Sequence, residues 1–275
     1  MTTEFDNTEV PKKNFSIELL SQPSDEDIAR IAGIFIRGYA QPYWGQDYSL
    51  DEAMGVISPY LENVNAQVFV LRSLEDKAIQ GFALTEFVPQ GDGLGFITNA
   101  LENLIPVPLK VSDQKVTLSV DVQTLNELST ELNEAYPVDS ERKLFFIGEV
   151  VIDETFRTKE TTPRNLSQYL WAAVANKAVE LAETNKVDVL GITVNHGPMY
   201  KMFKRVKFGR LFNSSFNYNH EDGTPSGRKL VIGRFPLDHP LARLSLTHPE
   251  LLFDIFRKLG RMKESLLNVL GEAIS

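Results

Sequence analysis

Residues 144–195 decide the fold, and they read LFFIGEVVIDETFRTKETTPRNLSQYLWAAVANKAVELAETNKVDVLGITVN. The two ends of this stretch, 144–152 and 187–194, are apolar runs of the length of buried strands. Between them, five apolar residues recur at helical spacing: Leu166, Leu170, Val174, Ala178 and Leu181. A strand, a helix and a strand in this order form a βαβ unit, so we expect the two strands to be parallel neighbours.

Further strand patterns extend a sheet on both sides of this unit. Before it, residues 15–20, 67–72 and 79–87 have strand patterns, and the acidic turn between the last two indicates a hairpin. After it, residues 208–219 and 228–235 are expected to pair antiparallel around a turn. The sequence therefore predicts an α/β fold with a mixed, mostly antiparallel sheet, a central parallel strand pair and flanking helices.

Helices and one long insertion complete this prediction. A helix is expected to begin after Ser24, an N-cap residue followed by three acids, and a second helix to span 50–61. Residues 89–142 form the insertion, which contains an apolar stretch and a helix pattern around Leu128. Its glycine-rich segment 91–95 indicates a turn, because the glycines do not have the spacing of a dinucleotide-binding motif.

The ends of the chain differ from the predicted domain. Residues 1–14 are polar and indicate a flexible tail, the domain is expected to span 15–235, and 236–275 indicate a helical extension. The tail does not have the basic and apolar regions of a secretory signal, and no stretch approaches the roughly 20 apolar residues that cross a bilayer. A cytoplasmic protein without a membrane partner is the expectation.

Composition excludes several classes of function. The 275 residues include 28 Lys and Arg against 37 Asp and Glu, a net charge of -9 that argues against a nucleic-acid partner. The chain has no cysteine, which excludes disulfides, thiolate metal sites and an acyl-cysteine intermediate. Its 4 histidines form no metal-binding pair at helical spacing, and neither a phosphate-binding P-loop nor a G-x-S-x-G nucleophile motif occurs. No metal is expected.

Three segments resemble motifs of the GNAT N-acyltransferase superfamily. Residues 148–157, GEVVIDETFR, are similar to the family's E-L-x-V-x-P-x-Y-R, and residues 190–195, LGITVN, to its L-x-V-x-x-x-N. Residues 199–208, MYKMFKRVKF, are similar to A-x-x-L-Y-x-x-x-G-F. The order of elements fits the family over residues 15–235, but only 145–211 carry motifs. The resemblance implies a GNAT-like fold and transfer of an acyl group, acetyl above all, from acyl-CoA directly to an amine.

The acyl donor's binding residues follow from this resemblance. The family's glycine-rich phosphate loop corresponds here to 157–167, which is degenerate because it has no glycine, although it is basic and leads into a helix N-terminus. An ordinary charged surface loop is the alternative. Asn195 would bond the cofactor or simply cap its strand. The residues that the resemblance assigns to the cofactor are Val151, Ile152, Arg157, Lys159, Arg164, Asn165, Ser167, Asn195 and Phe203.

Glu149 is the candidate catalytic base. It interrupts an apolar strand, so burial would raise its pKa into the range where a carboxylate accepts a proton from an ammonium group. A solvent-facing or ion-paired glutamate is the alternative. The resemblance also implies a backbone bulge near Gly148 and a tyrosine that protonates the leaving thiolate. Phe203 stands at that tyrosine's position, which leaves Tyr200, one turn earlier, as the candidate acid.

Tyr39, Tyr43 and Trp44 lie where the family binds its acceptor. Aromatic residues near acids suit a cationic or amphipathic amine, or they fill the core. The apolar part of the insertion would cover a bulky acyl or acceptor pocket, or bury the C-terminal helix. The partner is thus expected to be a small amine or amino-acid-like molecule, and a homodimer is compatible. Two other functions remain open: a non-catalytic ligand- or partner-binding protein of this fold, and an acyltransferase whose donor is bound to a carrier protein.

Overall fold

The computed structural model describes most of the predicted domain. The described residues are 15–41, 44–88, 91–137, 140–156, 166–195, 197, 200, 203–204, 209–238 and 240–247. The predicted tail 1–14 and the predicted helix at 248–274 lie outside the described residues.

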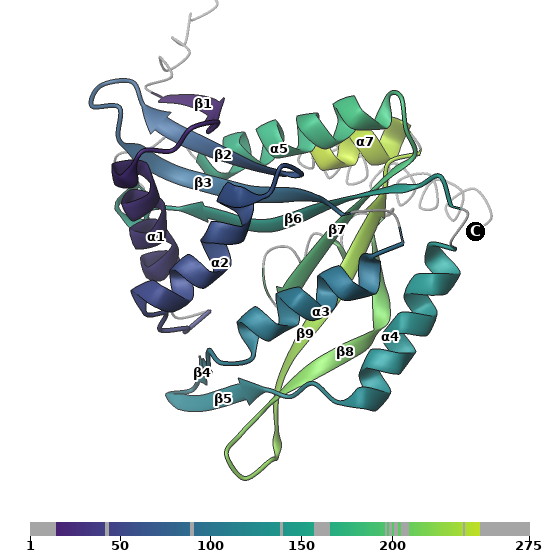
Figure 1. Ribbon diagram of the computed structural model, residues 1–275. Coiled ribbons are helices and arrows are strands. Elements are labelled where there is room, and N and C mark those ends of the chain that lie inside the picture. Colours follow the sequence, from purple (N-terminus) through teal and green to yellow (C-terminus); the bar gives the residue numbers. More distant parts are fainter. Residues whose placement is uncertain are drawn as a thin grey trace, which may run out of the picture.

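The described strands form one mixed sheet in the order β1-β2-β3-β6-β7-β9-β8-β5-β4 (Figure 1). Only β6 and β7 pair in parallel, and the other pairs of neighbouring strands are antiparallel. This confirms the predicted sheet with its central parallel pair. The strands are β1 Phe15–Leu19, β2 Ala66–Ser73, β3 Ile79–Val88, β4 Leu109–Val111, β5 Gln114–Leu118, β6 Lys143–Ile152, β7 Val187–Val194, β8 Arg210–Asn219 and β9 Pro225–Pro236.

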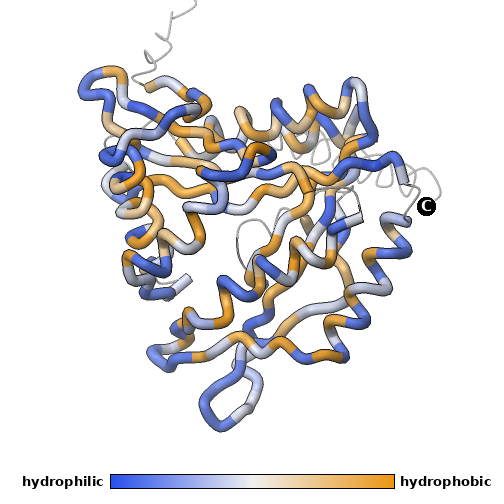
Figure 2. The backbone as a smooth tube through the Cα atoms, viewed as in Figure 1, coloured by the Kyte–Doolittle hydropathy of each residue, from blue (hydrophilic) through white to orange (hydrophobic). Residues whose placement is uncertain are grey.

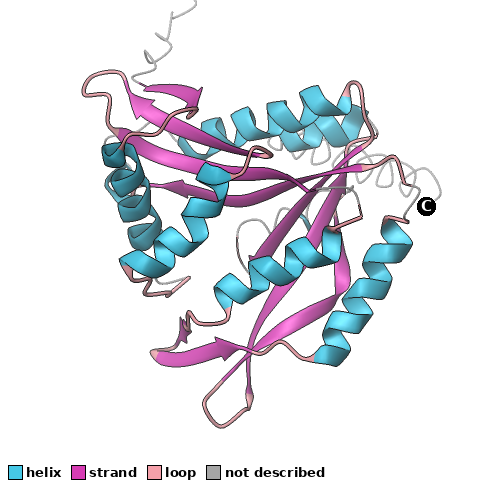
Figure 3. Cartoon of the chain, in the orientation of Figure 1, coloured by secondary structure: helices cyan, strands magenta, loops and turns pink. Residues whose placement is uncertain are grey.

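Helices cover both faces of this sheet (Figure 3). One face is covered by α5 and α7, and the other by α1 and α2 over β2 and β3 and by α3 and α4 over β8 and β9. In Figure 2 the central strands are mostly hydrophobic, whereas the helices alternate along their length. The helices are α1 Asp25–Tyr39, α2 Leu50–Glu62, α3 Gly93–Leu104, α4 Val122–Ala135, α5 Leu166–Ala182 and α7 Pro240–Thr247, with a short 3-10 helix, η1, at Glu154–Phe156.

Helix α1 begins where its sequence predicted. The Ser24 hydroxyl accepts a hydrogen bond from the Asp27 backbone N–H, and the Asp27 side chain accepts one from the Ser24 backbone N–H. This capping box satisfies two backbone groups that the helix itself leaves unpaired. It fixes the start of the helix whose last residue, Tyr39, reaches the candidate site.

The glycine-rich segment 91–95 was expected to be a turn, and that prediction is wrong for most of it. Gly91 has a φ of +82°, which fits a turn, but α3 begins at Gly93. Ile97 and Leu101 of this helix are both buried in the core under β7, β8 and β9. Their packing outweighs the low helix propensity of two glycines in the first turn. The insertion therefore supplies a helix and, through β4 and β5, the edge of the sheet.

Strands β6 and β7 run side by side for only part of their length. They pair from Lys143 opposite Val187 to Phe146 opposite Leu190, and beyond this point they diverge (Figure 1). On its other side, β6 pairs with β3 in a register that shifts between Leu84 and Thr85, so Gly148 is an extra residue that opposes no partner. This is a β-bulge, which bends a strand locally. The sheet is thereby opened between its two halves.

Candidate functional site

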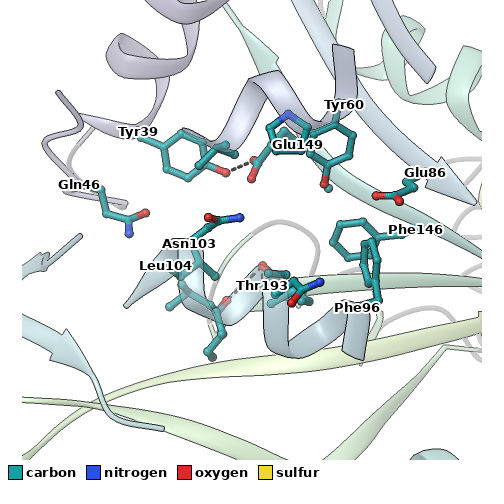
Figure 4. A pocket seen from close by; sticks show the side chains of 18 of the residues that line it. Tyr39, Gln46, Tyr60, Glu86, Phe96, Asn103, Leu104, Phe146, Glu149 and Thr193 are labelled. Carbon is teal, nitrogen blue, oxygen red and sulfur yellow. Dashed lines mark hydrogen bonds between the residues drawn. The ribbon is translucent and has the colours of Figure 1, made fainter. Parts of the chain in front are cut away.

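A cavity of about 360 Å³ lies where β6 and β7 separate. Its walls come from α1, the loop after it and α2 on one side, from α3 on the other, and from strands on both sides of the separation. Figure 4 shows side chains from these elements pointing toward a common space. Elements far apart in sequence thus meet at the one place where the parallel pair opens.

Glu149 follows the bulge on β6, and its carboxylate points into this cavity (Figure 4). The Tyr39 hydroxyl, at the end of α1, donates a hydrogen bond to Glu149 Oε2. Burial raises the pKa of Glu149 from 4.5 to about 7, although the hydrogen bond from Tyr39 acts in the opposite direction. At neutral pH, this carboxyl group can therefore both accept and release a proton.

Gly148 has Tyr60 of α2 directly against it. A Cβ at this position would lie 2.4 Å from Tyr60 Oη and 3.1 Å from Phe146 Cε1, so only glycine fits without a shift of these side chains. Burial raises the pKa of Tyr60, and the charges of Glu149 and Glu86 raise it further. The phenol therefore stays protonated and can donate a hydrogen bond beside the bulge.

A second carboxylate, that of Glu86 on β3, also lines the cavity. Its Oε1 accepts a hydrogen bond of 2.6 Å from the Asn63 side-chain amide, at the C-terminal end of α2. Burial raises the pKa of Glu86, while the bond from Asn63 lowers it. Sequence reasoning missed both Tyr60 and Glu86. Helical or strand periodicity indicates that such residues are partly buried, but does not indicate which distant elements they meet.

Two of the three residues predicted to bind the acceptor lie together at the cavity. Tyr39 and Trp44 line the cavity with their ring centres 5.2 Å apart, whereas Tyr43 lies outside the described residues. The loop that carries Trp44 is tied to the insertion, because the backbone N–H of Lys110 on β4 donates to Gly45 O at 2.9 Å. The Lys110 ammonium also pairs with Asp47. The insertion and the aromatic loop thus form one connected wall.

Several residues predicted to bind the acyl donor are part of the core. Val151 and Ile152 are 6% and 5% exposed, the first packed with α1 and α2 and the second with α5. Phe203 is 2% exposed and packs against β9, where a Cβ at Gly233 would lie 2.6 Å from its ring. A donor could therefore meet these residues mainly through their backbone.

Of the remaining predicted residues, Asn195 and Tyr200 are described, and neither lines the cavity. Asn195 ends β7, where its side chain donates to Gly227 O at 3.1 Å and accepts from the Lys229 N–H at 2.9 Å, as in the strand-cap alternative. Tyr200 has the Lys204 ammonium 4.9 Å from its ring centre and is not among the residues that line the cavity. The predicted phosphate-binding residues Arg157, Lys159, Arg164 and Asn165 lie outside the described residues, as does the side chain of Ser167.

The described residues contain no group of three or more histidines and acids placed to hold a metal ion. None of the described helices is both long and apolar enough to cross a membrane.

Comparisons with known proteins give similarity at the level of structure only. No model of a protein family matches the sequence, and no curated protein matches it. A mosquito arylalkylamine N-acetyltransferase-like protein is 12% identical, with a TM-score of 0.47, covering 81% of this chain and 100% of its own. The N-acyl amino acid synthase FeeM from uncultured soil microbes is also 12% identical, with a TM-score of 0.48, covering 85% of this chain and 94% of its own. The ribosomal-protein-S18-alanine N-acetyltransferase of Escherichia coli is 9% identical, with a TM-score of 0.43, covering 82% of this chain and 95% of its own.

The topology itself is the one expected from the motif resemblance. A mixed sheet has a single parallel pair, β6 and β7, which separates beside a bulge on β6. Helices α1 and α2 follow the first strand, and α5 connects the parallel pair. The chain has a GNAT-like fold.

Proposed function

We propose that this protein is an N-acyltransferase that moves an acyl group from acyl-CoA, with acetyl-CoA as the first donor to test, to a small amine. The observation that carries the proposal is the position of Glu149. Its carboxyl group has a pKa of about 7 and faces a cavity at the separation of β6 and β7, directly after a bulge. A base of this pKa beside an opened strand pair suits removal of a proton from an ammonium group at neutral pH.

The reaction would follow from these positions in one complex of enzyme, donor and amine. The thioester enters between β6 and β7, and the amine enters the cavity from the side of α1 and α2. Glu149 takes one proton from the ammonium group, and the neutral nitrogen then attacks the thioester carbonyl carbon. As the carbon–sulfur bond breaks, the nitrogen loses a second proton, the thiolate takes up this proton and leaves as the free thiol, and an amide remains. No cysteine is present to carry an acyl intermediate, so direct transfer is the simplest route.

The bulge and Tyr60 would stabilise the negative charge that develops on the carbonyl oxygen. A backbone N–H freed from the ladder at Gly148 can donate to this oxygen, and the protonated Tyr60 hydroxyl lies against the same residue. Donors aimed at such an oxygen contribute roughly 10²–10³-fold in rate. Tyr60 thus joins Tyr200, the sequence candidate, as a hydroxyl donor for the reaction, and Tyr60 is the one that lines the cavity.

The donor's phosphates would bind at the start of α5. We assign them to Arg157, Lys159, Arg164, Asn165 and Ser167, which combine positive charge with a helix N-terminus. The pantetheine arm would run along the backbone of β6 and β7 near Val151, Ile152, Asn195 and Phe203. Tyr39, Tyr43 and Trp44 would contact the acceptor.

The test is a screen of acyl-CoAs of several chain lengths against a panel of amines, read as release of free thiol. We expect release that depends on the amine and that falls roughly 10²–10⁴-fold in E149Q. E102Q makes the same change at an exposed residue of α3 and should leave the rate unchanged. Binding of acyl-CoA without thiol release would overturn the proposal in favour of a non-catalytic binding protein. Release only from an acyl group on a carrier protein would overturn acyl-CoA as the donor.

A further inference from the structure

The cavity has a second acidic end that the proposed reaction does not use. Its described lining includes the carboxylates of Glu149 and Glu86 and no lysine, arginine or histidine. Glu86 is half-buried, and among the described residues its side chain is hydrogen-bonded to the neutral amide of Asn63. Carboxylates taken out of water without a cation are costly, so a cationic ligand would relieve this arrangement.

The two carboxylates lie on the same face of the sheet. Glu149 pairs with Leu84 across β3 and β6, and Glu86 is two residues further along β3. Glu86 pairs with Phe146 on the other side of the bulge, so the two carboxylates flank the same bulge on β6. The charges of both carboxylates raise the pKa of Tyr60, and Figure 4 shows the Tyr60 side chain between them. One elongated ligand could therefore reach both carboxylates past the Tyr60 ring.

An unpaired hydroxyl in the same cavity independently indicates a polar ligand. Tyr48 is 5% exposed and lines the cavity, and among the described residues none forms a hydrogen bond of good geometry with its hydroxyl, although the nearby Gln46 side chain lowers its pKa against the larger effect of burial. Buried hydroxyls in folded proteins nearly always have one. The walls between the polar groups are aromatic, including Phe96 of α3 and Phe146 of β6 with ring centres 4.7 Å apart. Aromatic faces suit both the carbon chain and the cationic ends of an amine.

We propose that the acceptor is a linear diamine, or an amine with a second cationic group at a similar distance, and that Glu86 selects it. This inference rests on the proposed function, in which Glu149 receives the proton from the reacting end. Glu86, held by Asn63, binds the ammonium at the other end. Glu86 is therefore a specificity-determining residue for the acceptor.

The test compares amines that differ only in the second charge. Binding of putrescine and butylamine, and of cadaverine and pentylamine, is measured by calorimetry on the full chain. A hydrogen bond to a charged group contributes about 1.5–3 kcal/mol, so each diamine should bind roughly 10–150-fold tighter than its monoamine. In E86Q the two should bind alike, whereas E102Q should keep the preference.

Equal binding of diamine and monoamine by the wild-type chain would overturn the inference, and this comparison needs no variant. A preference that survives in E86Q would also overturn the role of Glu86. This experiment tests the diamine site separately from the proposed function, because binding can be measured without turnover. Diamine binding that depends on Glu86, without thiol release from any donor, would keep the site and refute the transferase. Thiol release that is as efficient with butylamine as with putrescine would support the transferase and overturn the selection of diamines by Glu86.

Discussion

Replacement of Glu149 by glutamine should change how the stability of the protein depends on pH. Burial raises the pKa of this carboxyl group from 4.5 to about 7 on folding. Between these two values the folded chain keeps a proton that the unfolded chain has lost, so the free energy of unfolding falls as the pH rises. This difference in pKa between the folded and unfolded states lowers the free energy of unfolding by about 3 kcal/mol once the pH is above about 7. The group's contribution is thus fully present below about pH 4.5 and is lost above about pH 7.

The glutamine side chain of E149Q has a similar shape, can still accept the hydrogen bond from Tyr39, and does not titrate. We therefore expect the variant to gain about 3 kcal/mol relative to wild type between roughly pH 4.5 and pH 8. Urea unfolding of both chains at a series of pH values measures this difference. The contributions of all other titrating groups cancel in the comparison, because the two chains share them. In the exposed control E102Q, the free energy of unfolding should depend on pH in the same way as in wild type. A difference between wild type and E149Q that stays constant with pH would refute the buried, proton-holding carboxyl group.

Three further substitutions test neighbouring parts of the structure. Tyr39→Phe removes the hydrogen bond that favours ionised Glu149, so the pKa of Glu149 should rise. The acidic limb of the pH profile of thiol release should then move to higher pH, and a limb that does not move would contradict this. Gly148→Ala places a Cβ 2.4 Å from Tyr60 Oη, so it should cost about 1–3 kcal/mol in urea unfolding and slow thiol release, and an unaffected variant would argue against the close contact. Phe203→Ala empties a core position that is 2% exposed and should cost about 3–5 kcal/mol of stability, whereas a loss below about 1 would show that the ring is not packed.

The sequence was most informative where one segment carries its own constraint. Residues 144–152 and 187–194 are mostly apolar and flank a helix, so a parallel pair could be predicted without the rest of the chain, and it is present. Glu149 stood out because it is the one acid in its strand, and its pKa is raised by burial. A capped helix start at Ser24 is equally local, and it is also present.

The remaining parts of the site depend on contacts between distant segments. Tyr60 and Gly148 meet because α2 crosses the bulge, and no pattern around either residue indicates this. Glu86 lies in a strand whose predicted pattern did not single it out from its neighbours. The helix α3 was missed because glycines in its first turn resemble a turn, while the packing that stabilises it comes from β8 and β9.

The role of Glu149 as the base is tested most directly by the pH dependence of kcat/KM for amine acylation in wild type and E149Q. We expect the wild-type value to rise about tenfold for each pH unit below about pH 7 and then to level off, as ionisation of a single base requires. In E149Q the value should be roughly 10²–10⁴-fold lower, and this limb should be absent. A variant that keeps both the rate and the limb at about pH 7 would show that Glu149 is not the base.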